Sequence, residues 1–200
     1  MATADEFQIV DRRLAFWQAF EPAVKCELSS CAVFTSQGLV FVDPIPLAAP
    51  ALEELVEAAA PVAIVITNGN HARAAVQFKK RFSIPILAHS DAVAELGLIP
   101  DLELAEGDEV VPGLTVIRIP GAGAGEIALH LASGVMVVGD ALIHLEPLGF
   151  SFLPEKYCAD FKAMRAGLRN LLRFEFDLMT FAHGLPLVVR ARPTLESLLS

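Results

Sequence analysis

Short apolar runs alternate with helical patterns along the first half of the chain, and the breaks between them contain Pro, Gly and Asp. Residues 31–42 predict a β-hairpin, because two apolar runs are joined there by a turn that contains glycine. Between residues 50 and 61 the apolar positions recur at helical spacing, which predicts a helix. The run VAIVIT at 62–67 is typical of a strand buried on both faces, and the pattern after it predicts a second helix that ends near residue 82.

The second half of the chain is dominated by the period of strands. We expect strands, separated by turns that contain glycine, at 109–111, 114–119, 127–131, 135–138 and 178–181, with a helix over 159–172. Strands in both halves, each flanked by helices, favour two packed sheets with helices outside. The pattern therefore predicts an α/β fold, a four-layer αββα sandwich, and the length of 200 residues suits a single domain over 1–200.

The apolar content is high, which raises the question of a membrane segment. The hydrophobic share is 54% and the mean hydropathy is +0.52. The longest uncharged stretch, residues 28–42, contains several polar side chains and is shorter than the ~20 apolar residues that a spanning helix needs. We therefore expect buried strands and no membrane partner. The first residues, MATADEF, lack the pattern of a secretory signal, so we expect a cytoplasmic location.

The charge balance argues against one class of partner. The net charge is −9, which would repel a phosphate backbone, and no segment rich in Lys and Arg offsets it. We therefore expect no nucleic-acid partner. The high apolar content leaves room for an extra dimer surface, so a homodimer is a possible assembly.

The turn after the predicted strand 62–67 lies where α/β folds commonly place binding sites. Its sequence, TNGNHAR at 67–73, resembles the Thr-His-x-His-x-Asp-His motif that binds two metal ions in the metallo-β-lactamase superfamily. In this alignment Asn68 and Asn70 stand at the first two histidine positions, Ala72 at the aspartate and Arg73 at the third histidine.

Two later segments strengthen the resemblance to this family. The turn PGAGAG at 120–125 resembles the family's Pro-Gly-His-Thr-x-Gly turn, with Ala122 at the place of a histidine ligand. Gly139-Asp140 retains the aspartate that bridges the two metals in the family, and FAHG at 181–184 retains the last ligand as His183. The resemblance covers residues 30–184 and implies the family's four-layer fold.

The resemblance implies that the family's dinuclear centre is lost, because only two of its seven ligand positions survive. Neutral asparagine amides bind zinc poorly, and a protonated arginine cannot bind a cation. We therefore favour a non-catalytic protein without a cofactor, which keeps a polar pocket for a small-molecule ligand or serves a structural role. The pocket candidates are Asn68, Asn70, His71, Arg73, Asp140, His144 and His183.

The alternative is a metal-dependent hydrolase with a reduced, mononuclear site. His71 lies inside the altered motif and could join Asp140 and His183 as a third ligand for one zinc, iron or manganese ion. Such a protein would act on an ester, thioester or phosphoester, as relatives do.

Arg73 offers a different solution for the buried aspartate. Its guanidinium could pair with Asp140 and replace the cation, although a position facing solvent is an equal alternative. His144 follows Asp140 by four residues, so it either borders the pocket or lies on the surface.

Overall fold

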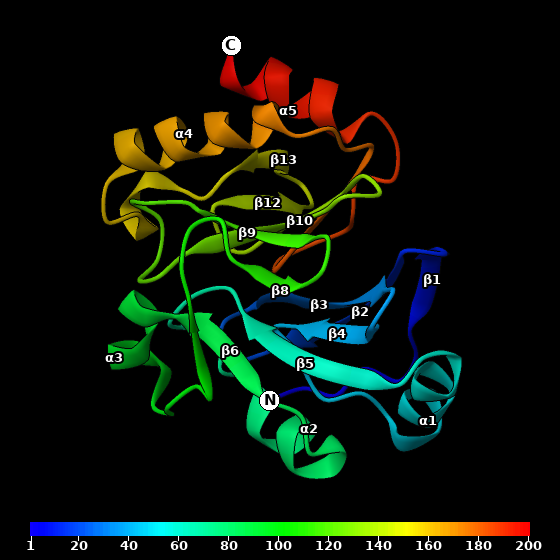
Figure 1. Cartoon of the computed structure of the whole chain (residues 1–200). Helices are drawn as coiled ribbons and strands as arrows, with labels where there is room; N and C mark the ends of the chain where they lie inside the picture. Colours follow the sequence, from blue (N-terminus) through cyan, green and yellow to red (C-terminus); the bar gives the residue numbers. More distant parts are fainter.

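The computed structural model describes residues 1–200 and has four layers (Figure 1). Two β-sheets face each other in the middle. Helices α1 (Ala49–Ala58) and α2 (Ala75–Phe82) cover the outer face of one sheet, and α4 (Phe161–Asn170) and α5 (Ala191–Leu199) cover the outer face of the other. This arrangement confirms the predicted αββα sandwich.

The first sheet has seven strands in sequence order. They are β1 (Gln8–Asp11), β2 (Leu14–Glu21), β3 (Cys26–Thr35), β4 (Gly38–Val42), β5 (Pro61–Ile66), β6 (Ile86–His89) and β7 (Leu102–Leu104). The pairs from β1 to β4 are antiparallel, whereas β4, β5, β6 and β7 run parallel to one another. Strand β5 lies inside this parallel part, which explains its almost uninterrupted apolar sequence.

The second sheet has five strands in the order β14-β11-β10-β9-β8. They are β8 (Glu109–Val111), β9 (Leu114–Arg118), β10 (Ile127–Leu131), β11 (Val135–Val138) and β14 (Leu178–Phe181). A separate hairpin contains β12 (Leu142–Leu145) and β13 (Gly149–Phe152). The remaining helical segments are short: η1 (Ser90–Ala92), α3 (Val93–Leu96), η2 (Glu155–Tyr157) and η3 (Leu171–Arg173).

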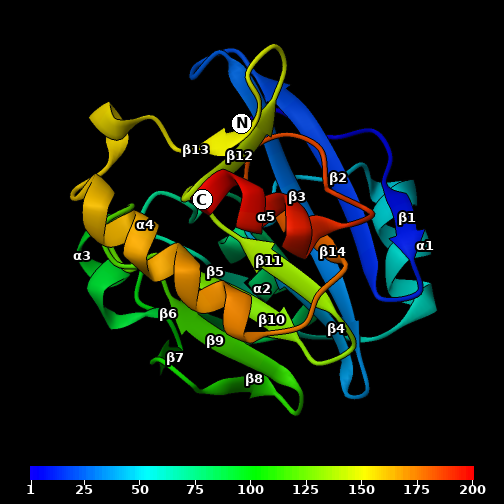
Figure 2. The same ribbon diagram turned by 90° about the horizontal axis from the view of Figure 1, so that it is seen from above.

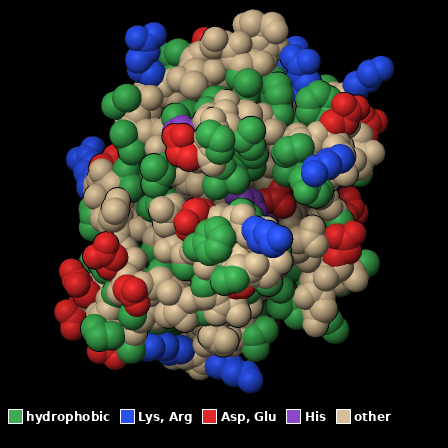
Figure 3. Space-filling model, turned by 180° about the vertical axis from the view of Figure 1, so that it is seen from behind, with side chains coloured by type: hydrophobic (Ala, Val, Ile, Leu, Met, Phe, Trp, Pro, Cys, Tyr) green, Lys and Arg blue, Asp and Glu red, His purple; other side chains and the backbone are tan.

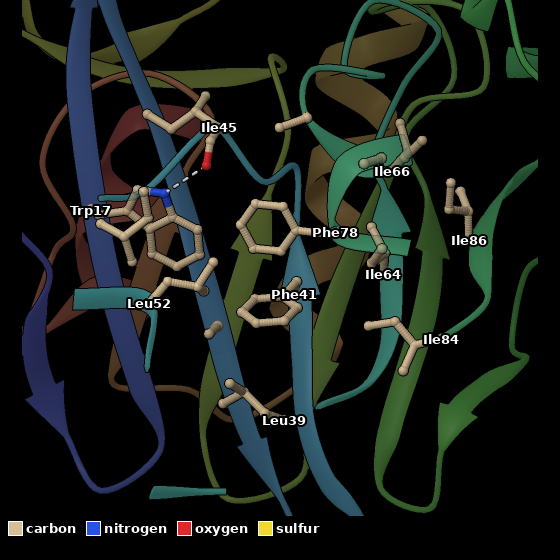
Figure 4. Close-up of a cluster of buried hydrophobic side chains, with 14 of the residues drawn as sticks. Trp17, Leu39, Phe41, Ile45, Leu52, Ile64, Ile66, Phe78, Ile84 and Ile86 are labelled. Carbon is tan, nitrogen blue, oxygen red and sulfur yellow. Dashed lines mark hydrogen bonds between the residues drawn. The ribbon is translucent and has the colours of Figure 1, made fainter. Parts of the chain in front are cut away.

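Apolar clusters fill each space between the layers. Under α1 and α2, the ring of Phe41 packs edge-on against Phe78 with ring centroids 4.8 Å apart (Figure 4). Trp17 packs in the same cluster and donates its indole N–H to the carbonyl oxygen of Ile45 at 3.2 Å. The buried indole therefore keeps a hydrogen bond while its ring contributes apolar contact.

The structure differs from the sequence-based expectation in three regions. Helix α2 begins at Ala75, later than the pattern suggests, because the turn before it is held away from helical geometry by a positive φ of 37° at Arg73. Strands β1 and β2 and the hairpin β12–β13 were not expected from the pattern. No helix of the structure is long and apolar enough to cross a membrane.

Arg13 connects the first hairpin to the second sheet. Its guanidinium donates to Asp11 at 2.7 Å, to Asp177 at 2.8 Å and to the carbonyl oxygen of Ser133 at 2.7 Å. The hydrogen bond from Arg13 lowers the pKa of Asp177. The depressed pKa means that this contact stabilises the fold at neutral pH and is lost as the pH falls through the folded-state value.

We expect Arg13→Gln to lower the free energy of unfolding by about 1 kcal/mol at pH 7, the upper end for exposed ion pairs, because several acceptors share one guanidinium. The deficit should shrink below about pH 4, where Asp177 becomes protonated in the unfolded chain. Urea denaturation at both pH values measures it. Arg81→Gln is the control, since Arg81 pairs only with the exposed Glu53 at 3.2 Å; an equal loss in both variants would contradict the prediction.

Candidate functional site

The site lies where the carboxyl ends of parallel strands from both sheets meet. In the first sheet β4 and β5 are parallel, and they are followed by Asp43 and by the turn that carries His71. In the second sheet β11 and β14 are parallel, and they are followed by Asp140 and His183. Because the strands of each pair are parallel and the two sheets pack face to face, the side chains of Asp43, His71, Asp140 and His183 lie at the same edge of the sandwich.

His71, Asp140 and His183 converge on one point. The Nε2 atoms of both histidines lie 3.1 Å from the same carboxylate oxygen, Oδ1 of Asp140. The potential ligand atoms of the three residues all lie within 4.8 Å of one another. Neither contact is a hydrogen bond, and this buried oxygen has no hydrogen-bond partner.

The other ring nitrogen of each histidine has a fixed acceptor. Nδ1 of His71 donates to Oδ2 of Asp43 at 2.8 Å, and Nδ1 of His183 donates to the carbonyl oxygen of Glu27 at 2.8 Å. In a neutral imidazole, a proton on Nδ1 leaves the lone pair on Nε2. Both lone pairs then face Asp140, which is the orientation that a carboxylate or carbonyl partner gives to metal-binding histidines.

The charges of the site are strongly coupled. Burial alone would lower the pKa of His71, but the charges of Asp140 and Asp43 raise it to about 9. Burial likewise opposes the charged form of His183, yet the carboxylate of Asp140, 3.1 Å from its Nε2 atom, raises the pKa of His183 to about 10. The positive charges of both histidines outweigh the burial of Asp140 and hold its pKa well below the usual range. Without another cation, the carboxylates of the site therefore favour the protonated form of both imidazoles.

Asp43 is a site residue that the sequence reasoning missed. It is 3% exposed, and it also accepts the backbone N–H of Thr67 at 2.8 Å and the hydroxyl of Thr67 at 2.5 Å. Burial disfavours its charge, but His71 and Arg73 beside it keep its pKa lowered. An acidic residue directly after an apolar strand that pairs with β5 was the available signal.

Arg73 does not pair with Asp140, which corrects that hypothesis. Its guanidinium instead donates to three backbone carbonyls, those of Ser29 at 2.5 Å, Asp43 at 3.0 Å and Ala182 at 3.2 Å. These carbonyls belong to segments of both sheets. The cation therefore links the sheets beside the site, while the two histidines hold Asp140.

The other predicted residues lie around this centre in different ways. Asn70 is exposed and lines the pocket. Asn68 is buried, donates its amide to Oε2 of Glu126 at 2.8 Å and does not line the pocket. His144 also lies outside the pocket lining, and its Nδ1 donates to the carbonyl oxygen of Leu185 at 2.8 Å.

Gly184, which follows His183, is required by a close backbone approach. Its φ is +92°, and a Cβ atom at this position would lie 1.8 Å from the carbonyl oxygen of His144. Any other residue would push strand β12 away from the end of β14. The His-Gly pair thus places the imidazole at the site while the backbone turns sharply against the hairpin.

A pocket of about 870 Å³ opens above the three converging residues. Its lining includes Asn70, His71, Arg73, Asp140 and His183, and most of the other lining side chains are hydrophobic. On the face shown in Figure 3, histidine atoms lie recessed between hydrophobic side chains. The arrangement is that of a ligand site, with a few convergent polar groups at the end of an apolar cavity.

Glu126 fills the space behind Asp140 and is a second residue that the sequence reasoning missed. Its Oε1 accepts the backbone N–H of Ala141 at 2.9 Å, while Oε2 accepts the amide of Asn68. Burial and the nearby charge of Asp140 raise its pKa to about 8. The carboxyl group satisfies two buried donors at the back of the site.

We expect Glu126→Ala to lower the free energy of unfolding of the metal-free protein by about 3 kcal/mol, because two buried donors lose their acceptor. Glu126→Gln should cost less, since one acceptor remains. The raised pKa makes the wild type lose stability as the pH rises from 4.5 to about 8, so the deficit of Glu126→Gln should shrink over that window. Urea denaturation at pH 5 and pH 8 tests this; a deficit that grows with pH would contradict it.

Known proteins with the same architecture have been solved. A metallo-β-lactamase from Pontibacter korlensis superimposes with a TM-score of 0.75 at 17% identity, covering 97% of this chain and 98% of that chain. The metallo-β-lactamase FIM-1 from Pseudomonas aeruginosa, in a mono-zinc form, gives a TM-score of 0.72 at 17% identity, with 96% and 93% covered. TTHA1623, in a di-iron-bound form, gives 0.63 at 24% identity, with 80% and 89% covered.

A sequence search finds no match among curated proteins. The family model described as the metallo-beta-lactamase superfamily, however, matches residues 9–177, which is most of the chain. The structural neighbours share its fold over nearly the same extent. The chain therefore belongs to the metallo-β-lactamase superfamily.

Proposed function

We propose that this protein is a metal-dependent hydrolase that holds one divalent cation with His71, Asp140 and His183. The observation that carries the proposal is the buried Oδ1 atom of Asp140, which has no hydrogen-bond partner although two imidazole Nε2 atoms lie 3.1 Å away. A buried carboxylate oxygen without a partner is costly, and a cation among these three groups would satisfy it.

The chemistry of the donor set fits a cation of the zinc, iron or manganese type. Two imidazoles and one carboxylate are common ligands of these metals, and three protein ligands with an open side are typical of catalytic sites. The acceptors of the two Nδ1 atoms, Asp43 and the carbonyl of Glu27, fix both rings with Nε2 inward. The open side is the pocket of about 870 Å³.

One cation fits this chain better than two. Only one group of histidine, cysteine or acidic side chains in the structure has the spacing of a metal site. Asn68, at a position where the sequence comparison places a histidine ligand, is committed to Glu126 by its amide. FIM-1 was solved with one zinc and TTHA1623 with two irons, so related folds bind either number.

A bound cation would supply Lewis-acid polarisation of an ester or thioester carbonyl. The protein's own groups hold the reacting centre in place: Asp43 orients His71, the Glu27 carbonyl orients His183, and the apolar lining excludes water from the substrate. The exposed Asn70 can donate a hydrogen bond to a substrate oxygen at the pocket edge.

The second candidate is a non-catalytic protein that binds a small molecule in the same pocket without a metal. The size and mostly apolar lining of the pocket favour it, because such a cavity can bind a ligand with no chemistry. The two candidates differ in one measurable property, the presence of a stoichiometric cation.

We expect the purified protein to bind close to one equivalent of zinc, iron or manganese, measured by elemental analysis and by calorimetric titration of chelator-treated protein. His183→Ala should abolish both stoichiometric binding and esterase activity. His130→Ala is the control, because His130 lies on β10 and bonds to the carbonyl of Glu175. Full activity with no bound metal, or unchanged metal binding in His183→Ala, would contradict the proposal.

Asp43→Asn should weaken metal affinity by about 10- to 100-fold, the usual effect of removing the acceptor that orients a histidine ligand. An asparagine amide can donate to Nδ1, which would place the proton of His71 on Nε2, where the cation should bind. Calorimetric titration with zinc measures the change, and circular dichroism checks that the variant is folded. Wild-type affinity in a folded Asp43→Asn variant would show that Asp43 does not orient His71.

A further inference from the structure

The pocket continues from the three converging residues into an apolar trough. We define the apolar trough by its rim, Val24, Leu148 and Tyr157, and its walls, Leu28, Ile143, Leu145 and Leu153. The walls are buried or half-buried, with Ile143 at 4% exposure beside the polar end. A ligand that lay along the trough would contact mainly apolar side chains between the rim and the polar end at His71 and Asp140.

The rim is unusual because large apolar side chains stand in solvent there. Val24 is 59% exposed, Leu148 is 64% exposed and Tyr157 is 63% exposed. They come from three separate segments: the turn between β2 and β3, the turn between β12 and β13, and η2. Figure 2 shows the β12–β13 hairpin reaching toward the β2–β3 turn. Exposed apolar groups that gather from distant segments at one opening are typical of a binding surface.

The trough offers no free lysine or arginine to an anionic group of a substrate. Arg73 is the only Lys or Arg that lines the pocket, and its guanidinium is occupied by three backbone carbonyls. Glu21 adds a negative charge to the lining, and the whole chain has a net charge of −9. An anionic group on the part of a substrate that lies in the apolar trough would therefore lose its hydration without gaining a free lysine or arginine as a partner.

We infer that the substrate is an uncharged ester or thioester whose acyl group is an apolar chain lying in the apolar trough. This inference rests on the proposed hydrolase function and names its substrate class. The reaction adds water across the acyl bond: the C–O or C–S bond breaks, the acyl carbon gains the water oxygen, and the alcohol or thiol leaves with a proton. No oxidant or further reactant is needed.

Chain-length dependence is the first test. With zinc- or manganese-loaded protein and p-nitrophenyl esters from acetate to octanoate, kcat/KM should rise by up to about fourfold per methylene, the ratio that corresponds to ~0.8 kcal/mol per buried methylene. The mono-p-nitrophenyl ester of succinate, which carries a carboxylate, should react more slowly than the butyrate ester of similar length. Equal rates along the neutral series, or a preference for the charged ester, would overturn the inference.

Variants of the rim residues test whether the chain-length dependence arises from the trough. Val24→Ser and Leu148→Ser should flatten the rise of kcat/KM with chain length, with a larger loss for the octanoate ester than for the acetate ester, because only the longer chain reaches the rim. Val189→Ser is the matched control: Val189 is 69% exposed but does not line the pocket. A control variant that flattens the series as strongly as Val24→Ser would contradict the role of the rim.

A binding measurement separates this inference from the proposed function. Calorimetric titration of metal-free protein with neutral aliphatic amides from acetamide to octanamide should give affinity that rises with chain length in the wild type and in Val189→Ser, but not in Leu148→Ser. If the protein binds longer amides more tightly but binds no metal, the proposed function is wrong, whereas the binding of apolar chains in the trough is confirmed. If metal binds and acetate ester is hydrolysed without chain-length dependence in either assay, the inference fails alone.

Discussion

The three hydrogen bonds of the half-buried Arg73 guanidinium are the interaction on which the arrangement of the site depends. It donates to carbonyl oxygens of Ser29 and Asp43 in the first sheet and of Ala182 after the last strand of the second. Two of these carbonyls accept a second donor, since the N–H of Ser29 donates to Ala182 at 2.8 Å and the hydroxyl of Ser30 donates to Asp43 at 2.6 Å. The permanently charged fork of Arg73 therefore joins one hydrogen-bond network that includes both sheets. The same contacts fix the distance between the segment that carries Asp43 and the segment that carries His183.

Most of the fold could be predicted from the pattern of apolar positions. The β3–β4 hairpin, the buried strand β5 and the strands of the second sheet follow from local periodicity, because burial on one or two faces leaves a direct mark on the sequence. Strands β1 and β2 and the hairpin β12–β13 were missed. Strand β13 is only half-buried along its length, so neither face has a clear apolar pattern.

The site was predictable only in part. Asp140 and His183 were found by their resemblance to a family motif, and His71 was considered as a third ligand. The roles of Asp43 and Glu126 depend on partners that are distant in the sequence. Oδ2 of Asp43 contacts His71, 28 residues away, and Oε1 of Glu126 accepts the N–H of Ala141, 15 residues away. A local sequence pattern does not encode such contacts. The pairing of Arg73 with Asp140 was wrong, because Arg73 donates to backbone carbonyls, and a comparison of side chains gives no information on these acceptors.

The backbone contact at Gly184 affects the distance between the rim of the pocket and its polar end. The N–H of His144 donates to the carbonyl oxygen of His183 at 3.0 Å, and the N–H of Leu185 donates to the carbonyl oxygen of His144 at 3.2 Å. The hairpin that carries Leu148 at its tip is therefore bonded to the residue that carries the imidazole at the polar end. These backbone hydrogen bonds fix the distance between Leu148 at the rim and the imidazole of His183. A change in the length of the β12–β13 hairpin would therefore change that distance.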